Sequence, residues 1–302
     1  MKVGVIGIGY WGQKVVREYA SLLNEGYIDY LALCDIDQSK LREFKEYDTF
    51  TDFDELLRNV YAVHICTNND THYEVAKKAL EEKIHVLVEK PMTTNRNDAF
   101  NLIELAYENG TILQVGHIYR FANAIRRVRE LYQNMFFGDV YYINLRWSHL
   151  MPPMRDVDVL WDLLPHPLDI LNFVTKKWPN EFLGVGRAFR RNRLNEVASL
   201  QAIFDDSLFA NIHLSWLSPI RRRIMEIVGS ERSAIIECVK QEITVYENDG
   251  SVRQLNVKSN NTIRDEIINF INAIKTGRNN FNSAIIGLRT VELIEQALSA
   301  LR

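Results

Sequence analysis

The most restrictive feature of the sequence is a short apolar run, residues 3–6, that leads directly into three spaced glycines, Gly7, Gly9 and Gly12. In this spacing the first glycine permits a tight turn, the second lets a phosphate approach the backbone, and the third lets a helix pack closely on the strand. The free N–H groups and the positive dipole end at the start of that helix attract phosphate oxygens. The pattern therefore predicts a strand, turn and helix that bind the diphosphate of a dinucleotide.

An acidic residue, Asp35, follows the second apolar run, residues 31–34, about two dozen residues beyond the glycines. A carboxylate at this distance accepts hydrogen bonds from the ribose hydroxyls of the adenosine half of the cofactor. Asp37 follows closely, and no lysine or arginine comes at once, so a 2'-phosphate would meet two carboxylates and no nearby cation. The sequence therefore favours NAD over NADP. The alternative is that Asp35 only begins a turn.

From residue 2 to about residue 116, short β-type runs alternate with helical stretches, which implies crossover connections and a parallel sheet. The helical stretches 71–82 and 98–108 each place apolar side chains on one face. Besides the two strands above, strands are expected at residues 62–66, 85–88 and 112–115. Five strands in this order predict a doubly wound parallel sheet, the NAD-binding Rossmann domain, over residues 1–118.

The pattern changes after Gly116. Helices are expected at residues 121–132 and 160–174, a strand at 140–147, and a long β-rich region beyond them. Residues 208–216 alternate apolar and polar side chains, as in a strand with one covered face. Further strands are expected at hairpin spacing, at residues 224–228, 234–238, 243–246 and 252–257.

Two helices are expected to end the chain. A capping box, Thr262 with Asp265, begins a helix that ends at Gly277, and a last helix spans residues 284–301. Residues 119–302 are therefore predicted to form a second, α+β domain. Its core is an open, mostly antiparallel sheet with helices on one face, and the last helix either belongs to it or packs back on the Rossmann domain.

A lysine between an acid and a proline, Glu89-Lys90-Pro91, closes the apolar run 84–88. Such a run is typical of a buried parallel strand, and ligands of open parallel sheets bind just beyond the carboxyl ends of the strands. Pro91 restricts Lys90 to extended geometry, so the amine is held at that edge. The sequence therefore places a cation where α/β enzymes carry out chemistry. The alternative is an ordinary solvated lysine after a strand.

The composition argues against several other classes of function. The formal net charge of −3 gives no electrostatic basis for nucleic acid or an anionic membrane as the main partner. The first strand starts at Lys2, which leaves no room for a signal peptide, and no apolar stretch approaches the roughly 18 residues of a membrane span. A cytoplasmic protein is therefore expected. Cys34, Cys66 and Cys238 lack metal-ligand spacing, so we expect reduced thiols and no metal site.

Four motifs taken together resemble one enzyme family, that of glucose-fructose oxidoreductase, inositol dehydrogenase and the rhizopine-catabolism proteins (Gfo/Idh/MocA). They are the glycine turn, residues 66–72 after the third strand, residues 89–91, and residues 115–121, and the match spans almost the whole chain. The resemblance implies a Rossmann domain followed by an open-sheet domain that shapes a sugar site. It further implies a homodimer or homotetramer built through that sheet.

The same resemblance implies which residues meet the cofactor and the substrate. Besides the glycines, Asp35, Glu89 and Lys90, the cofactor contacts that it carries over are Tyr10, Trp11, Thr67, Asn68, His72 and Gln114. The substrate contacts that it carries over are Lys90, His117, Arg120, Arg155, Asp162 and His166.

An acid and a histidine on a helix of the second domain complete the family's site, and Asp162 and His166 match them. If this stretch is helical, their four-residue spacing places both side chains on one face. Pro165 and Pro167 flank the histidine, which departs from the commoner family pattern, and we expect them to break the helix locally. The alternative for the pair is a capping acid followed by a structural histidine.

Oxidation of a secondary alcohol requires removal of the hydroxyl proton as hydride leaves the same carbon. We assign the general base to His166, because an unperturbed imidazole has a pKa near neutrality, with Asp162 orienting the ring or binding a neighbouring hydroxyl. Lys90 is expected to donate a hydrogen bond to the reacting oxygen. The sequence leaves a second assignment open, in which burial lowers the pKa of Lys90 and Lys90 is the base.

Residues 155–166 look most like the subgroup that acts on nucleotide-linked sugars, such as the UDP-N-acetylglucosaminuronate 3-dehydrogenases. This resemblance implies oxidation of a sugar ring hydroxyl to a ketone. Arg155 is then a substrate or cofactor contact, or a surface arginine. The arginine-rich runs 190–193 and 221–223 suit a diphosphate, and they equally suit solvated strand ends or subunit contacts.

Two other functions stay open at this point. One is an oxidoreductase of the same family that acts on a free sugar, an inositol or an imine. The other is a non-catalytic NAD-binding regulator, against which the presence of Lys90, Asp162 and His166 argues, because a sensor has no need of proton-handling groups.

Overall fold

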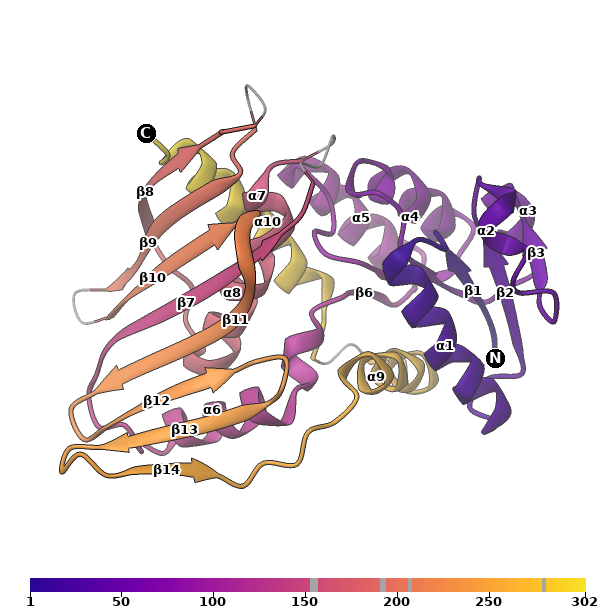
Figure 1. The fold of residues 1–302 in the computed structure, drawn as a ribbon. Coiled ribbons are helices and arrows are strands. Elements are labelled where there is room, and N and C mark those ends of the chain that lie inside the picture. The colour runs from indigo at the N-terminus through magenta and orange to yellow at the C-terminus, as the bar shows by residue number, and fades with distance from the viewer. Residues whose placement is uncertain (153–156, 191–193, 206–207, 279–280) are drawn as a thin grey trace. The chain divides into compact units, whose positions relative to one another are not determined.

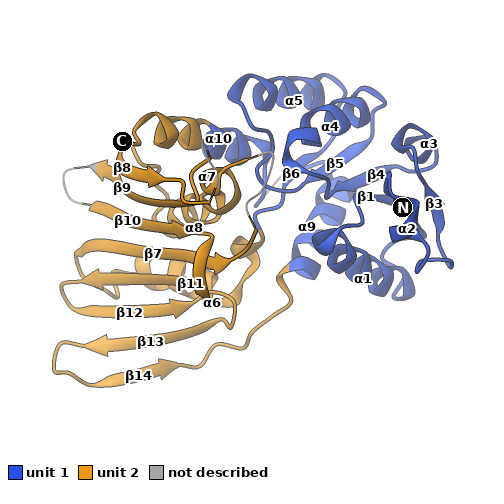
Figure 2. Cartoon of the chain, turned by 45° about the horizontal axis from the view of Figure 1, so that its top comes forward, with its two compact units in different colours: residues 1–117, 263–291 blue, residues 118–262, 292–302 orange. Residues whose placement is uncertain are grey.

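The computed structural model describes the chain except residues 153–156, 191–193, 206–207 and 279–280 (Figure 1). The described residues form two compact units, drawn in different colours in Figure 2. Unit 1 consists of residues 1–117 and 263–291, and unit 2 of residues 118–262 and 292–302. We expected the first domain to end at residue 118, and the first segment of unit 1 ends at residue 117. Residues 263–291, expected in the second domain, group with unit 1.

Unit 1 contains a six-stranded sheet in which every neighbouring pair of strands is parallel. The strand order is β3-β2-β1-β4-β5-β6, so the chain changes direction across the sheet beside β1, where open α/β sheets bind their ligands. The short β3 is an addition to the five expected strands. The strands are β1 (Lys2–Ile6), β2 (Tyr30–Cys34), β3 (Asp48–Phe50), β4 (Ala62–Ile65), β5 (His85–Val88) and β6 (Leu113–Val115).

The helix α9 (Thr262–Thr276) explains why a late segment of the chain groups with unit 1. Its Ile267 and Ile271 lie in the same buried cluster as Val3 and Val5 of β1, and Phe270 packs with a neighbouring cluster. Each such side chain gains about 1.5–3 kcal/mol from burial. The other helices that begin in this unit are α1 (Tyr10–Asn24), α2 (Gln38–Leu41), α3 (Phe53–Leu57), η1 (Asn69–Thr71), α4 (His72–Glu81), α5 (Arg96–Glu108) and α10 (Ala284–Ser299).

Unit 2 contains an eight-stranded sheet in the order β14-β13-β12-β11-β7-β10-β9-β8. All neighbouring pairs are antiparallel except β10 with β7. The expected alternation in β10 is present, with Leu208, Ala210, Ile212 and Leu214 buried. The strands are β7 (Val140–Leu150), β8 (Glu181–Arg187), β9 (Val197–Asp205), β10 (Leu208–Ser215), β11 (Leu217–Gly229), β12 (Arg232–Glu237), β13 (Glu242–Glu247) and β14 (Val252–Leu255).

The predicted fold class, a Rossmann sheet followed by a mostly antiparallel open sheet with helices, is confirmed. The helices of unit 2 are η2 (Ile118–Phe121), α6 (Asn123–Gln133), α7 (Val159–Leu163) and α8 (Pro165–Thr175), and α6 and α8 pack against each other. Across the described part of the chain, no helix combines the length and the apolar character needed to cross a membrane.

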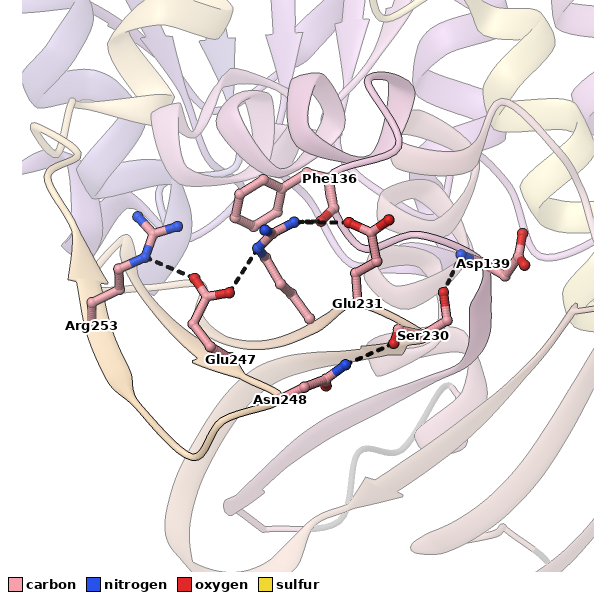
Figure 3. A network of polar contacts seen from close by, with 8 residues as sticks. Phe136, Asp139, Ser230, Glu231, Glu247, Asn248 and Arg253 are labelled. Carbon is pink, nitrogen blue, oxygen red and sulfur yellow. Dashed lines mark hydrogen bonds and ion pairs between the residues drawn. The ribbon is translucent and has the colours of Figure 1, made fainter.

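A polar network ties together the strands at one edge of the unit 2 sheet (Figure 3). Glu247 on β13 accepts hydrogen bonds from Arg232 on β12 at 2.8 Å and from Arg253 on β14 at 3.1 Å. The amide of Asn248 donates to the backbone oxygen of Ser230 at 2.9 Å. Half-exposed pairs of this kind contribute about 0–1 kcal/mol each, so they add little to the stability of the sheet.

Candidate active site

The glycine turn between β1 and α1 has the geometry that its spacing predicts. Gly7 has a φ of +93°, and a Cβ on Gly12 would lie 1.9 Å from the Gly7 backbone oxygen, so neither position accepts a side chain. A Cβ on Gly9 would meet no heavy atom within 4 Å, which leaves the backbone open to an approaching group. Tyr10 is exposed in the first turn of α1, whose N-terminus has no side-chain cap. These features fit the diphosphate of a dinucleotide.

The carboxylate of Asp35 is buried at the end of β2 and is held by several donors. It accepts hydrogen bonds from the backbone N–H of Ile8 at 2.7 Å and of Asp37 at 2.9 Å. Lys40 also pairs with it, at 3.1 Å, because the Asp37 side chain caps α2 and the helix brings Lys40 back. The sequence argument that no cation stands near Asp35 is therefore wrong, since it considered only the residues that follow at once.

The buried His72 joins the turn after β4 to the segment that carries Lys90. Its two ring nitrogens lie 2.8 Å from the backbone oxygen of Pro91 and 3.2 Å from that of Thr67. Burial lowers the pKa of His72, which favours the neutral ring. Asn68 is exposed before η1, and Thr67 accepts a hydrogen bond from the Thr71 hydroxyl at 2.8 Å. His72 therefore holds the turn after β4 against the segment that carries Lys90, and this structural role needs no ligand.

Glu89 lies buried at the end of β5 in a hydrogen-bonded chain with Trp11 and His64. Trp11 Nε1 donates to the carboxylate, and His64 Nε2 lies 3.3 Å from the same oxygen. Burial raises the pKa of Glu89, but the His64 hydrogen bond and charge, the Trp11 donor and the charge of Lys90 outweigh it and hold the pKa below its usual range. A Cβ on Gly116 would lie 2.8 Å from this carboxylate, so Gly116 leaves room for it.

Sequence reasoning missed His64, although a histidine inside an otherwise apolar strand was a visible signal. His64, Cys66 and Glu89 also offer ligand atoms within 4.8 Å of one another, a separation that would suit a metal ion. However, burial raises the pKa of the Cys66 thiol well above its ordinary value, and a metal needs the thiolate. The Glu89 oxygen already has two nitrogen partners. We therefore interpret the cluster as a hydrogen-bonded chain that fixes the end of β5 against α1.

A lowered carboxyl pKa stabilises the fold above the pKa of the unfolded chain, and this stabilisation is lost as pH falls through the folded value. We expect Glu89→Gln to lower the free energy of unfolding by about 1–3 kcal/mol at neutral pH, because His64 and Trp11 lose a charged partner. The deficit should shrink below the ordinary glutamate pKa of about 4.3. Urea unfolding across this pH range checks it, with the exposed Glu108→Gln as control. An equal deficit at all pH values would contradict the assignment.

Lys90 follows β5 as a half-buried residue, and its peptide bond to Pro91 is cis. The two other predicted contacts of unit 1 are buried near the end of β6. Gln114 accepts a hydrogen bond from the Asn269 amide of α9 at 3.2 Å, and His117 is 1% exposed. Gln114 therefore serves the packing of α9 on the sheet.

The stretch that carries Asp162 and His166 is helical but interrupted, as the flanking prolines predict. α7 ends at Leu163 and α8 begins at Pro165, while the backbone of Leu164 between them stays in the right-handed helical region. Pro165 and Pro167 occupy the first turn of α8, where a missing N–H costs little because those groups have no partner within a helix. Asp162 thus lies on α7 and His166 on α8, within one continuous helical path.

Asp162 and His166 belong to one cluster of aromatic and charged side chains in unit 2. Asp162 Oδ2 accepts a hydrogen bond from Trp216 Nε1 at 2.8 Å. The His166 ring meets Tyr119 edge to face, with ring centroids 5.1 Å apart. Burial raises the pKa of Tyr119, so its phenol stays neutral. The guanidinium of Arg223 interacts electrostatically with both Tyr119 and Asp162, which connects the two halves of the cluster.

The remaining predicted arginines have different surroundings. Arg120 is buried, with Nε donating to Asp169 and Nη2 to Asn172 at 2.9 Å, so the structure gives it partners within unit 2. Arg190 pairs with the buried Glu196 at 2.7 Å. Arg155 lies outside the described residues, as do residues 191–193 of the arginine-rich run.

Two family profiles match the chain, one over each of its two main regions. The family profile described as "Oxidoreductase family, NAD-binding Rossmann fold" (Gfo/Idh/MocA) matches residues 1–117, and that of the Gfo/Idh/MocA C-terminal domain matches residues 125–235. The chain is 28% identical over 302 residues to a UDP-N-acetylglucosamine 3-dehydrogenase of Acidithiobacillus ferrooxidans, covering 96% of this chain and 94% of that protein. It is 23% identical over 300 residues to a myo-inositol 2-dehydrogenase of Thermotoga maritima, covering 92% and 89%.

Solved structures of other oxidoreductases have the same fold along nearly the whole chain. That of the A. ferrooxidans UDP-N-acetylglucosamine 3-dehydrogenase matches with a TM-score of 0.87 at 27% identity, covering 100% of this chain and 97% of that one. A structure described as a putative NADPH-dependent oxidoreductase from Desulfitobacterium hafniense matches with a TM-score of 0.89 at 18% identity, covering 100% and 95%, and this likeness concerns the fold alone. The two family profiles together span most of the chain, in the order of the two units. The chain therefore belongs to the Gfo/Idh/MocA family of NAD-binding oxidoreductases.

Proposed function

We propose that the protein oxidises a ring hydroxyl of a nucleotide-linked sugar, of the class of UDP-N-acetylglucosamine or its uronate. The observation that carries this proposal is the cluster of Asp162, His166 and Arg223 in unit 2, which combines an acid, a base and a buried cation. Support also comes from the similarity to a UDP-N-acetylglucosamine 3-dehydrogenase over nearly the full length of both chains.

The proposed chemistry assigns cofactor binding to unit 1 and substrate binding to unit 2. NAD, when bound, supplies the hydride acceptor. Lys90 donates a hydrogen bond to the substrate oxygen that becomes a carbonyl and stabilises its developing negative charge. His166 removes the hydroxyl proton, Tyr119 supports the imidazole ring, and Asp162 orients the ring or binds a neighbouring hydroxyl. In the reductive direction the same groups return the proton.

We further propose NAD in preference to NADP. The Asp35 carboxylate is buried and held by two backbone donors, so it keeps a fixed negative charge where a 2'-phosphate would lie. Lys40 offsets part of that charge, but its side chain is 40% exposed and its contribution is screened by solvent.

Replacement of Asp35 by serine tests this preference. The variant loses the acceptor for the ribose hydroxyls and keeps Lys40, which then faces an incoming 2'-phosphate alone. We expect the ratio of kcat/KM for NAD to that for NADP to fall by about 10- to 100-fold. The double variant Asp35→Ser, Lys40→Ala should keep the lowered kcat/KM with NAD. It should not show the raised kcat/KM with NADP that the single variant gains from Lys40. An unchanged ratio in the single variant would overturn the role of Asp35.

We propose that the protein assembles as a homodimer or homotetramer through the unit 2 sheet. One face of that sheet carries a hollow of about 1000 Å³ that is lined by residues of β7, β8, β9, β10 and β11 and by the last residues of the chain. Leu183, Val185 and Phe209 are exposed on these strands. Exposed apolar side chains gathered on one face are typical of a protein interface.

We also propose a cytoplasmic location. Cys34, Cys66 and Cys238 are free thiols, two of them buried, as suits a reducing compartment.

A substrate panel tests the proposed function. The purified protein is incubated with NAD and, separately, with UDP-linked N-acetyl sugars, their uronates, free sugars and inositols, while NADH absorbance is followed. We expect turnover with a nucleotide-linked sugar. Turnover with inositol alone would favour the second candidate, which the similarity to the T. maritima enzyme supports. Cofactor binding without turnover of any of these would favour a non-catalytic regulator.

A further inference from the structure

Arg223 on β11 is a buried cation that lacks the usual partner. Its side chain is 7% exposed, yet no carboxylate among the described residues lies within ion-pair distance of it. Nη1 donates to the backbone oxygens of Ser148 at 3.1 Å and Arg222 at 2.9 Å, and Nη2 lies 3.0 Å from His149 Nδ1. Buried charges in proteins are normally paired with an opposite charge, because desolvation of an isolated charge is costly.

The hydrogen bonds of Arg223 leave one side of its guanidinium available. A guanidinium has five N–H donors in a rigid fork. The three described acceptors use Nη1 and one hydrogen of Nη2, and no described residue accepts a hydrogen bond from Nε. Nε and Nη2 lie on one edge of a guanidinium, and a carboxylate or phosphate can accept hydrogen bonds from two donors on such an edge.

The surroundings of Arg223 connect this cation to the proposed reaction. Arg223 pairs with Trp147 on β7, and the Trp147 ring meets Tyr119 edge to face with centroids 5.6 Å apart. Tyr119 in turn packs on the His166 ring, and Asp162 is an electrostatic neighbour of Arg223. Arg221, two residues earlier on β11, is exposed and adds positive charge. Burial and the Arg221 charge lower the pKa of Arg223, but a guanidinium stays protonated in proteins. The unpaired cation therefore belongs to the same cluster as the proposed acid and base.

We propose that Arg223 binds an anionic group of the substrate, a phosphate or a carboxylate, and so selects a negatively charged sugar over a neutral one. The inference rests on the proposed function and narrows its substrate class. A neutral sugar or an inositol would leave the guanidinium unpaired, which disfavours those ligands by the cost of a desolvated charge. The anion has two chemical sources, the diphosphate of a nucleotide sugar and the carboxylate of a uronic acid.

The first experiment measures anion binding without turnover, because the protein is loaded with NADH, which accepts no hydride. Binding of UDP and of glucuronate to the NADH-loaded protein is measured by calorimetry for the wild type, Arg223→Gln and Arg223→Lys, with the exposed Arg222→Gln as matched control. We expect loss of at least about tenfold in affinity for one anion in both Arg223 variants, and little change in the control. Weakened UDP binding identifies the diphosphate, and weakened glucuronate binding identifies the carboxylate. Wild-type affinity for both anions in a folded Arg223→Gln protein would overturn the proposal.

The second experiment separates this inference from the proposed function and from a purely structural role. Steady-state rates are measured for the wild type and variants with any sugar that the panel shows to react. A structural role would lower kcat/KM for charged and neutral substrates alike, whereas anion recognition raises KM for the charged substrate alone. If Arg223→Gln does not fold, the Arg223→Lys protein, which keeps the charge but loses the fork, decides the result. Anion binding that depends on Arg223 without any sugar oxidation would refute the proposed function and leave the anion site standing.

Discussion

Replacement of Lys90 by methionine is expected to lower kcat by about 10²–10³-fold while cofactor binding is retained. Methionine has a similar length and no charge, so it removes the hydrogen-bond donor that we propose for the reacting oxygen. The surrounding segment keeps its support, because His72 holds the backbone of Pro91 and not the amine of Lys90. The measurement is single-turnover kinetics beside NAD titration by fluorescence.

A matched control for this variant is Lys83→Met, which lies in the exposed turn before the same strand. It should retain wild-type rates. If Lys90→Met lost NAD affinity as strongly as it lost rate, Lys90 would be a cofactor contact and not a donor to the reacting oxygen. If it lost neither, the lysine would be the ordinary solvated residue that its type alone suggests.

Replacement of His166 by asparagine is expected to lower kcat by about 10²–10⁴-fold and to remove one limb of the pH profile. Asparagine keeps a hydrogen-bonding side chain of similar reach but takes up no proton near neutrality. The rate of the variant should recover toward high pH, where hydroxide replaces the general base. The measurement is kcat and kcat/KM across the pH range of activity.

This variant also decides between the two candidate bases. If Lys90 and His166 act in one proton-removal step, the double variant Lys90→Met, His166→Asn should have a kcat close to that of the slower single variant. The reason is that the effects of residues that act as a unit are not additive. His213→Asn on β10 is the control, since His213 contacts Ser199 on the sheet. A His166→Asn rate within a few-fold of wild type would assign the base to Lys90.

The fold was accessible from the sequence because its signals are local. The glycine turn imposes steric demands on adjacent residues, and the alternation of strands and amphipathic helices follows from backbone periodicity. The prolines beside His166 likewise mark the boundary between α7 and α8, although the helical path continues through Leu164. The three-residue β3 escaped notice because so short and exposed a strand has no periodic pattern.

Other features depend on contacts that no local pattern specifies. The apolar face of α9 predicts that this helix packs on a hydrophobic core. It does not predict that the core is that of unit 1. Lys40 reaches Asp35 only because Asp37 caps a short helix between them, although the Asp37 and Ser39 spacing was a readable signal. Arg221 is exposed and Arg223 is buried, although they lie two residues apart on β11. The pairing of β11 with β7 shifts between Leu217 and Arg222, so Arg223 pairs with Trp147 whereas the pairing skips Arg221.

The most direct test of the account follows a labelled hydride. A UDP-linked N-acetyl sugar with deuterium on its ring carbons is incubated with NAD and the protein, and the reduced cofactor and the sugar are examined by mass spectrometry. We expect NADH that carries one deuterium and a keto sugar in equal amount, both formed about 10²–10³-fold more slowly with Lys90→Met. NADH without deuterium, or no reduced cofactor with any nucleotide-linked sugar, would contradict it.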